Sequence, residues 1–438
     1  MHRKTALTST IAVGLLALAA CAPGSTSSTP TGAAAPTSSG TTGADAKPVT
    51  VTVWHYWDGT NADTFQAMAD EYTKADPGVT VKAVNIPSSD LITKIQTSAQ
   101  TDTLPTMAIM DLVSVPQVAQ TGKLVDLKPL IDPATMGDIY PSLLDFGKDG
   151  DKQYAVPVST NNLGYMYNKD LYRQTGLDPD MPPKTWEELQ SQAQQILDKT
   201  GKPGVELFTQ AGDSGEGLTW NFQVSLWQTG GEFLNSDNTK AAFNTAAGTK
   251  ALQFWVDLLD KGLAPRTQWG EFEKGNAGGA QEGAWMVGIW QGDPPFDFGT
   301  ATVPYPSDGR PATNMGGERA VVFTSDEATQ KAAAGFLDWF LAPEQVTTWS
   351  EKTGMLPVRK AVGDSDTYKQ WVGQTQPLLQ PFVDQLATAK SRPNTPLYPQ
   401  VSLAFAKQIE KALAGQVSVA DALSAAETDV NEILAAGQ

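Results

Sequence analysis

The sequence predicts an α/β fold in which mainly parallel sheets are flanked by helices. Two strand–helix pairs and a third strand follow one another at residues 48–110. Right-handed connections of this kind place helices on both faces of a parallel sheet. A chain of 438 residues has room for about three domains or for two large lobes. In such sheets ligands bind beyond the carboxyl ends of the strands.

Hydrophobic periodicity identifies the first elements. Residues 48–54 and 79–86 are rich in β-branched residues and predict strands, and the apolar residues 106–110 predict a third strand. Residues 61–75 and 91–99 carry apolar side chains at helical spacing. The order strand, helix, strand, helix, strand follows directly from these five segments.

Helices dominate the predictions for the rest of the chain. Thr185, followed three residues later by Glu188, matches a capping box that opens a helix to about Lys199. Apolar residues at helical spacing predict four more helices, at 249–261, 328–341, 404–413 and 419–434.

The composition excludes several classes of function. The chain carries 31 Lys+Arg against 48 Asp+Glu, a formal net charge of −17, so its charge does not favour nucleic acid or an anionic membrane surface as a partner. One Cys excludes a disulfide framework, and two His leave little room for metal clusters or His-dependent triads. We therefore expect no cofactor and no metal. A soluble binding protein and an enzyme that works with carboxylates both remain open.

The N-terminus has the pattern of a secretory signal. Arg3 and Lys4 precede an apolar run at residues 11–20, which is too short to stay in a bilayer as a span. Residues 18–21 (LAAC) resemble the bacterial lipobox, in which the signal is cut before the Cys and the Cys is lipidated. We predict a lipoprotein signal peptide at 1–20 and a lipid anchor at Cys21, with an ordinary secretory signal as the alternative.

A tether is predicted to follow, at residues 21–48. Apart from Asp45 and Lys47, every residue from Ala22 to Lys47 is Ala, Gly, Pro, Ser or Thr. Such a segment buries too little apolar area to offset its chain entropy, so we expect it to be disordered. A cell-wall or O-glycosylated stalk is the alternative, and both place the folded part outside the cytoplasm.

Several segments, in order along the chain, carry a resemblance to one family. The motifs are VTVWHYW at 51–57, residues 104–111 with 119–127, YAVP at 154–157 with YNKDL at 167–171, PKTWEEL at 183–189, FEKGNAGGAQEGAW at 272–285, Gly316-Gly317, and TGMLPVR at 353–359. Together they resemble the extracellular solute-binding proteins (family 1) of carbohydrate-uptake ABC transporters, in their lipoprotein form. The family usually has Pro-Asp where this chain has Pro105-Thr106.

The resemblance implies a binding protein without catalysis, folded as a two-lobed clamp with hinge strands between the lobes. Lobe one is expected at 49–158 plus 300–358, and lobe two at 159–299 plus 359–438. The implied partners are a small carbohydrate and the permease subunits of a transporter with a cytoplasmic ATPase. The implied protein is a monomer, lipid-anchored to the cell membrane.

A sugar offers hydroxyl groups and apolar C–H faces, so its site calls for aromatic rings and polar side chains. The chain has 12 Trp, and we expect Trp57, Trp220 and Trp290 to lie in loops instead of periodic core positions. Trp290 is the preferred stacking residue because a loop, Gln291 to Pro294, follows it. Trp285 is expected to pack in the core instead, which is the alternative for any of these Trp.

Polar candidates come from strand ends and from the resemblance. Asp58 and Asp111 follow the first and third predicted strands, where each carboxylate either contacts a ligand or caps a helix. The resemblance adds Asn161, with Asn162 able to exchange roles with it, and Arg392, whose alternative is a surface position.

A further candidate is the segment around two glycines. Gly316 and Gly317 resemble paired glycines at which the family's backbone approaches its ligand; a turn that needs positive φ is the alternative. Glu318 stands where relatives often have an aromatic residue, which leaves the orientation of a sugar open.

Two other functions stay open at this point. Glycerol 3-phosphate or a related glycerophosphodiester would suit the same fold, with Arg392 or Arg319 and the amides of Gly316-Gly317 at the phosphate. A surface glycosidase that uses two carboxylates is the second alternative, because such enzymes need neither His nor Cys.

Overall fold

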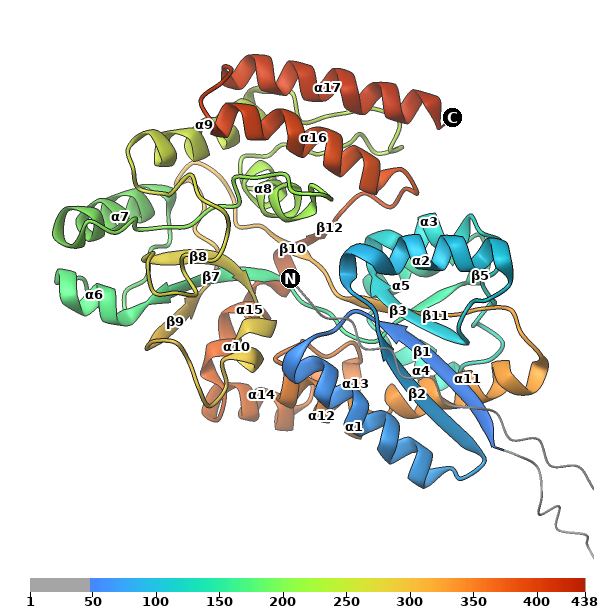
Figure 1. Ribbon diagram of the computed structural model, residues 1–438. Coiled ribbons are helices and arrows are strands. Elements are labelled where there is room, and N and C mark those ends of the chain that lie inside the picture. The colour runs from blue at the N-terminus through green and yellow to red at the C-terminus, as the bar shows by residue number, and fades with distance from the viewer. Residues whose placement is uncertain (1–47, 438) are drawn as a thin grey trace, which may run out of the picture. The chain divides into compact units, whose positions relative to one another are not determined.

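The computed structural model describes residues 48–437 (Figure 1). The predicted signal peptide, Cys21 and all of the predicted tether but Pro48 lie outside the described residues. None of the helices in the described range combines the length and apolar character that a membrane crossing requires. Within the same range, no group of three or more His, Cys, Asp or Glu side chains is placed to hold a metal ion.

The first sheet has five strands in the order β2-β1-β3-β11-β6. These strands are β1 (Val49–His55), β2 (Val79–Asn85), β3 (Met107–Asp111), β6 (Ala155–Pro157) and β11 (Glu318–Val322). β1 runs parallel to β2 and β3, which confirms the predicted strand–helix–strand units, whereas β11 is antiparallel to both β3 and β6. The intervening helices are α1 (Gly59–Ala75) and α2 (Ser88–Thr101).

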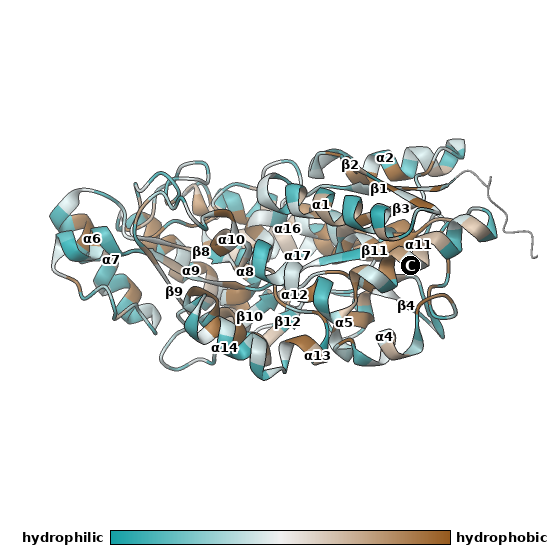
Figure 2. Cartoon of the chain, turned by 90° about the horizontal axis from the view of Figure 1, so that it is seen from below, coloured by the Kyte–Doolittle hydropathy of each residue, from teal (hydrophilic) through white to brown (hydrophobic). Residues whose placement is uncertain are grey.

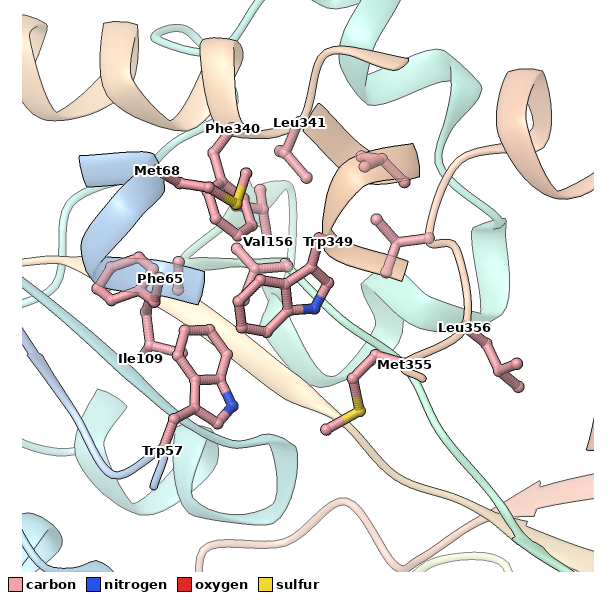
Figure 3. Close-up of a cluster of buried hydrophobic side chains, with 14 of the residues drawn as sticks. Trp57, Phe65, Met68, Ile109, Val156, Phe340, Leu341, Trp349, Met355 and Leu356 are labelled. Atoms are coloured by element: carbon pink, nitrogen blue, oxygen red, sulfur yellow. The ribbon is translucent and has the colours of Figure 1, made fainter. Parts of the chain in front are cut away.

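Helices pack on both faces of this sheet. The helices that join α1 and α2 there are α3 (Val115–Ala119), α4 (Pro133–Asp138), α5 (Pro141–Leu144), α11 (Glu327–Phe340) and α12 (Pro343–Thr353). Phe65 of α1, Phe340 of α11 and Trp349 of α12 share one core cluster with Val51 of β1, which Figure 3 shows in part. Side chains of α2 and α3 form a second cluster with β3 on the opposite face.

The second sheet has three strands in the order β8-β7-β9. These strands are β7 (Leu163–Asn168), β8 (Gly279–Gly283) and β9 (Phe298–Ala301). Both pairings are antiparallel, so the expectation of a mainly parallel sheet in each lobe is wrong for this one. The chain between β7 and β8 forms several helices instead of one crossover helix, and no single strand–helix–strand unit therefore imposes a parallel pairing.

A helical layer covers the second sheet. It contains α6 (Lys169–Thr175), α7 (Trp186–Thr200), α8 (Glu216–Gln228), α9 (Ala246–Asp260), α16 (Tyr398–Leu413) and α17 (Val419–Ala436). The predicted capping box of Thr185 and Glu188 is present at the start of α7. α16 and α17 lie side by side (Figure 1) and share a large core cluster with α8 and α9. Apolar residues gather on the helix faces that point inward (Figure 2).

Short elements complete the fold. They are β4 (Lys148–Asp149), β5 (Lys152–Gln153), β10 (Thr313–Met315), β12 (Ala389–Ser391), α10 (Trp285–Ile289), α13 (Lys360–Gly363), α14 (Asp366–Gln374), α15 (Gln380–Asp384), and the 3-10 turns η1 (Leu112–Ser114), η2 (Asp145–Gly147), η3 (Pro377–Leu379) and η4 (Gln385–Thr388). β10 and β12 pair in parallel as a separate two-stranded sheet.

Two extended segments leave the first sheet, one toward the second sheet and one toward the β10–β12 pair. Residues 158–162 join β6 to β7, and residues 316–317 join β10 to β11. The amide of Gly316 donates to the carbonyl of Asn161 at 2.9 Å, so the two segments are hydrogen-bonded to each other. A third segment joins them where the amide of Leu356 donates to the carbonyl of Thr160 at 2.8 Å. Residues of these connecting segments line the cavity that is described next.

Candidate functional site

A cavity of about 300 Å³, here called the inner chamber, lies where β1 and β3 end and the connecting segments pass. Its lining residues are Tyr56, Trp57, Asp58, Asn61, Ser88, Asp111, Asn161, Trp220, Trp285, Ile289, Gly316, Gly317, Glu318 and Met355. Eight of the eleven ligand-binding residues predicted from the sequence are in this set. The chamber therefore lies at the carboxyl ends of the parallel strands, as expected for this class of fold.

A second cavity of about 570 Å³, here called the outer chamber, continues the first. The two cavities share Tyr56, Ser88 and Asp111 in their linings. Hydroxyl and amide side chains of α2, η1 and α3 line one side of the outer chamber, and residues just before and at the start of α8 line the other. The chambers thus form one continuous cleft with contributions from both sheets' helices.

Four buried polar atoms in the inner-chamber lining lack a hydrogen-bond partner among the described residues. Two are donors, the indole Nε1 groups of Trp57 and Trp220. Two are acceptors, the side-chain Oδ1 atoms of Asn61 and Asn161. An unpaired buried donor or acceptor costs free energy, and native proteins pair nearly all of them with protein, water or ligand. These four atoms are suited to a ligand that both donates and accepts hydrogen bonds.

Aromatic rings form part of the chamber wall. Trp57 follows β1 and is held in place by Phe65 and Trp349, whose ring centroids lie 5.2 and 4.5 Å from its own (Figure 3). Trp220 and Trp285 are half-buried and stack with their ring centroids 5.7 Å apart. Because neighbouring groups fix their orientation, these rings can meet a ligand without losing much side-chain entropy.

A buried arginine links two carboxylates beside the chambers. Arg392 donates to Asp111 at 2.9 Å and to Glu216 at 2.6 Å, and its side chain is 1% exposed. Tyr398 and Ser402 also donate to Glu216. Asp111 ends β3 of the first sheet, whereas Glu216 begins α8, so the ion pairs connect the two sides of the cleft.

Burial and charge oppose each other in this network. Burial disfavours the charged guanidinium of Arg392, but the neighbouring Asp111 and Glu216 carboxylates outweigh it and raise its pKa above the usual range. Burial raises the pKa of Glu216, although Arg392 works against the shift. The guanidinium is therefore a charged group whose charge is already compensated by its neighbours.

Glu318 is also tied into the protein. Its carboxylate accepts hydrogen bonds from Tyr56 at 2.9 Å and from the hydroxyl of Ser159. Burial raises its pKa. The adjacent Arg319 is fully buried, lines neither chamber, and donates to the backbone carbonyls of Ser159 and Glu318. Burial lowers the pKa of Arg319 to about 10.

Some of the aspartates and glycines that line the cavities also shape the backbone next to them. The Asp111 carboxylate accepts from the amide of Val113, so it caps η1, and it also lines both chambers. Asp58 precedes α1 without a side-chain capping bond. Gly317 has a φ of +115°, and a Cβ at Gly316 would strike Asn161, so close approach of the connecting segments requires both glycines.

Three predicted residues do not line the inner chamber. Arg392 lies behind it as the partner of Asp111. Asn162 is fully buried, and its amide donates to the carbonyl of Phe382 at 2.8 Å, so this group is satisfied inside the protein. Trp290 is only 8% exposed and packs in the core, because the loop after it does not expose the ring.

Trp285 is the reverse case, since it was expected in the core and lines the chamber. The predicted loop position of Trp220 is also wrong, because Trp220 lies on α8. Sequence reasoning missed the other lining residues: Tyr56, Asn61, Ser88, Ile289 and Met355. Tyr56 lies between the end of β1 and Trp57, and this position at a strand end could have identified it from the sequence. Met355 is far from these residues in the sequence, and only tertiary packing brings it to the chamber.

A larger hollow of about 1100 Å³ lies along α16 and α17. Its lining contains Lys407, Lys411, Asp429 and Glu432, and none of the predicted site residues. Charged side chains on neighbouring helix faces are typical of a solvated surface. The inner and outer chambers are therefore the better candidates for a ligand site.

The chain is similar to bacterial extracellular binding proteins over most of its length. The family described as bacterial extracellular solute-binding proteins matches residues 67–375. The crystal structure of the cyclic α-maltosyl-1,6-maltose binding protein from Arthrobacter globiformis is 61% identical, covering 88% of this chain and 99% of that one, with a TM-score of 0.81. An ABC transporter solute-binding protein from Thermotoga lettingae bound with α-D-tagatose is 26% identical over 88% of this chain and 99% of that one, with a TM-score of 0.77.

A curated relative has another ligand in its name. The sn-glycerol-3-phosphate-binding periplasmic protein UgpB of Pectobacterium atrosepticum is 26% identical over 304 residues, which span 64% of this chain and 66% of that protein. The solved structures share the two-lobed α/β fold that the sequence predicted. This chain therefore belongs to the bacterial extracellular solute-binding protein family.

Proposed function

We propose that this protein is the extracellular sugar-binding component of an ABC transporter. Its proposed ligand is an α-glucosidic oligosaccharide of the kind bound by the Arthrobacter relative, cyclic α-maltosyl-1,6-maltose. The observation that carries the proposal is the inner chamber, in which aromatic rings stand beside unpartnered neutral donors and acceptors. The 61% identity to that relative supports the choice of sugar.

The chemistry of the lining suits hydroxyl groups. A sugar hydroxyl both donates and accepts, so it can accept from the Nε1 groups of Trp57 and Trp220 while its neighbours donate to Asn61 and Asn161. The apolar C–H face of a pyranose ring can pack on Trp285. One ligand can therefore satisfy the buried polar atoms and cover the aromatic surface together.

Charge argues against a phosphate ligand. Among residues 48–437, no Lys, Arg or His lines either chamber, whereas Asp58, Asp213 and Glu318 do. The nearby Arg392 already has two carboxylate partners. A phosphate would enter a net acidic cleft without a free cation, which is unfavourable. We therefore favour a neutral sugar over glycerol 3-phosphate, despite the 26% identity to UgpB.

A glycosidase is the weaker alternative. The carboxylates of Asp111 and Glu216 are bound to Arg392, and that of Glu318 accepts from Tyr56 and Ser159. The family and the relatives described above are binding proteins, so binding without catalysis is the function that they support.

Calorimetry with purified protein tests the assignment. Cyclic α-maltosyl-1,6-maltose and linear malto-oligosaccharides should bind at one site per chain and raise the melting temperature, because a ligand that prefers the native state stabilises it. Under the same conditions sn-glycerol 3-phosphate should do neither. Binding of glycerol phosphate alone would overturn the sugar proposal, and release of hydrolysed sugar would show an enzyme.

Delivery to a transporter completes the proposed role. The lobes are proposed at 49–158 plus 300–358 and at 159–299 plus 359–438, closing on the ligand as a monomer and passing it to permease subunits with a cytoplasmic ATPase. Small-angle scattering should show contraction with sugar. Lipidation of Cys21 after removal of residues 1–20 would hold the protein at the membrane. Cys21→Ser should release the protein from membranes with its sugar affinity intact; retention would contradict the anchor.

A further inference from the structure

The outer chamber differs from the inner chamber in the chemistry of its wall. Its polar lining includes Ser89, Thr93 and Gln96 of α2, Ser114 of η1, Gln117 of α3, and Asp213 before α8. None of the Trp residues lines it. Its wall can therefore bind hydroxyl groups but offers no indole ring to pack against a sugar.

α2 presents a polar stripe to this chamber. Ser89, Thr93 and Gln96 are spaced by four and three residues, which places them on one face of the helix. The opposite face carries Ile95, which is buried in the core, and Leu91 and Ile92 of the same helix also line the chamber. An amphipathic surface helix usually turns such a stripe to bulk solvent, whereas here it borders a cavity that joins the ligand site.

Two amides on this wall are available to a ligand. Gln96 and Gln117 are half-buried, and within residues 48–437 their side chains form no hydrogen bond to another group. Each amide carries a carbonyl acceptor and two N–H donors, which matches vicinal hydroxyl pairs of a sugar ring. They come from different helices, and both line the outer chamber.

The two cavities adjoin, so one ligand can occupy both. Tyr56, Ser88 and Asp111 line both of them, and Asp111 is fixed there by Arg392 and by the amide of Val113. A ligand larger than the inner chamber can extend past these residues into the outer chamber. The volumes of about 300 and 570 Å³ leave more room outside the aromatic chamber than inside it.

We infer that the outer chamber is a second sugar subsite, and that Gln96 and Gln117 determine a preference for oligosaccharides longer than two rings. This inference rests on the proposed function. A disaccharide is held by the aromatic inner chamber alone, whereas a tetrasaccharide places its further rings against α2 and α3. Ligand length is thus selected by hydrogen bonds on one wall of the cleft.

Calorimetric titration of the Gln96→Ala/Gln117→Ala variant with maltose and with cyclic α-maltosyl-1,6-maltose tests this. Loss of two amides should weaken tetrasaccharide binding about tenfold or more, with maltose affinity unchanged within about twofold. Gln100→Ala is the matched control, since Gln100 is an exposed residue of the same helix that lines neither chamber. Equal melting temperatures of variant and wild type show that the variant is folded.

The outcomes separate this inference from the proposed function. Wild-type affinity of the double variant for the tetrasaccharide would overturn the second subsite. An equal loss for maltose and for the tetrasaccharide would also overturn it, because the amides would then act on the inner chamber. If neither sugar binds the wild-type protein, the sugar assignment fails as a whole.

Discussion

Trp285 and Trp290 lie five residues apart, at the start of α10 and directly after its end, yet they have different surroundings. Trp285 lines the inner chamber and stacks on Trp220. Trp290 packs edge-on against Phe296 and Phe298, with ring centroids 5.7 and 5.0 Å away. Five helical residues amount to one turn and about 140° more, so the two rings leave α10 on different sides. Proximity in sequence to the site does not make an aromatic residue part of it.

The largest expected effect of an alanine substitution is a loss of stability when Trp290, the core residue of this pair, is replaced. Trp290→Ala removes a buried ring from the cluster with Phe296 and Phe298 and should lower the free energy of unfolding by about 3–5 kcal/mol. Urea unfolding followed by far-ultraviolet circular dichroism measures it. Sugar affinity of the folded fraction should stay at the wild-type value. Weakened binding with normal stability would place Trp290 at the ligand.

Glu282 on β8 is a titratable side chain that, like Trp290, is buried in the core. Burial, above all, raises its pKa from 4.5 to about 8. Between these values the folded state binds more protons than the unfolded state, so stability falls as pH rises from about 4.5 to 8 and is level above that. The fall should be on the order of 5 kcal/mol.

Glu282→Gln removes this titration while its side-chain oxygen can still accept from the amide of Gly283. The pH dependence of unfolding should therefore flatten between pH 5 and 8, with sugar affinity unchanged. An unaltered pH profile in the variant would show that Glu282 is not the group that titrates.

Trp285→Ala tests the ligand side. Loss of a half-buried ring at the site should weaken sugar binding by about 2 kcal/mol, or roughly 30-fold, with a smaller loss of stability than Trp290→Ala. Trp371→Ala is the matched control, because Trp371 is also half-buried and lines neither chamber. Calorimetry that gives the two variants equal affinity would remove Trp285 from the site.

The smallest effect isolates one hydrogen bond. Trp220→Phe removes an indole Nε1 that has no partner in the described protein, so sugar affinity should fall about threefold to tenfold with little change in melting temperature. Trp186→Phe is the opposite case, because its Nε1 donates to Gln228 and to the carbonyl of Pro304. Trp186→Phe should lower the melting temperature and leave sugar affinity unchanged. Weakened sugar binding in Trp186→Phe and unchanged binding in Trp220→Phe would show that the Trp220 indole does not contact the ligand.

Much of the first sheet could be predicted because local signals agree there. Alternating apolar residues locate β1 and β2, and parallel strands end at one edge, so Trp57, Asp58 and Asp111 were placed near the site. The helix termini were less accurate. α16 begins at Tyr398 and not near residue 404, because Pro399 lies in its first turn, where a helix tolerates a residue that usually interrupts one.

The second sheet and six of the fourteen inner-chamber residues could not be obtained in this way. The antiparallel pairing of β7 with β8 joins strands separated by a long helical segment, which no local pattern indicates. The same holds for the direction of Trp285 from α10. A short helix carries too few residues to show which face is buried.

The sequence by itself determined the order of β1, α1, β2, α2 and β3, the capping box of α7, the family resemblance and most of the inner-chamber residues. Only the tertiary structure decided that Arg392 binds Asp111 and Glu216, which lie 281 and 176 residues away in the chain, and that Trp285 and not Trp290 lines the cavity. The physical reason is the distance along the chain over which each effect acts. Periodicity and capping act within a few turns, whereas a cleft is formed by groups that only packing brings together.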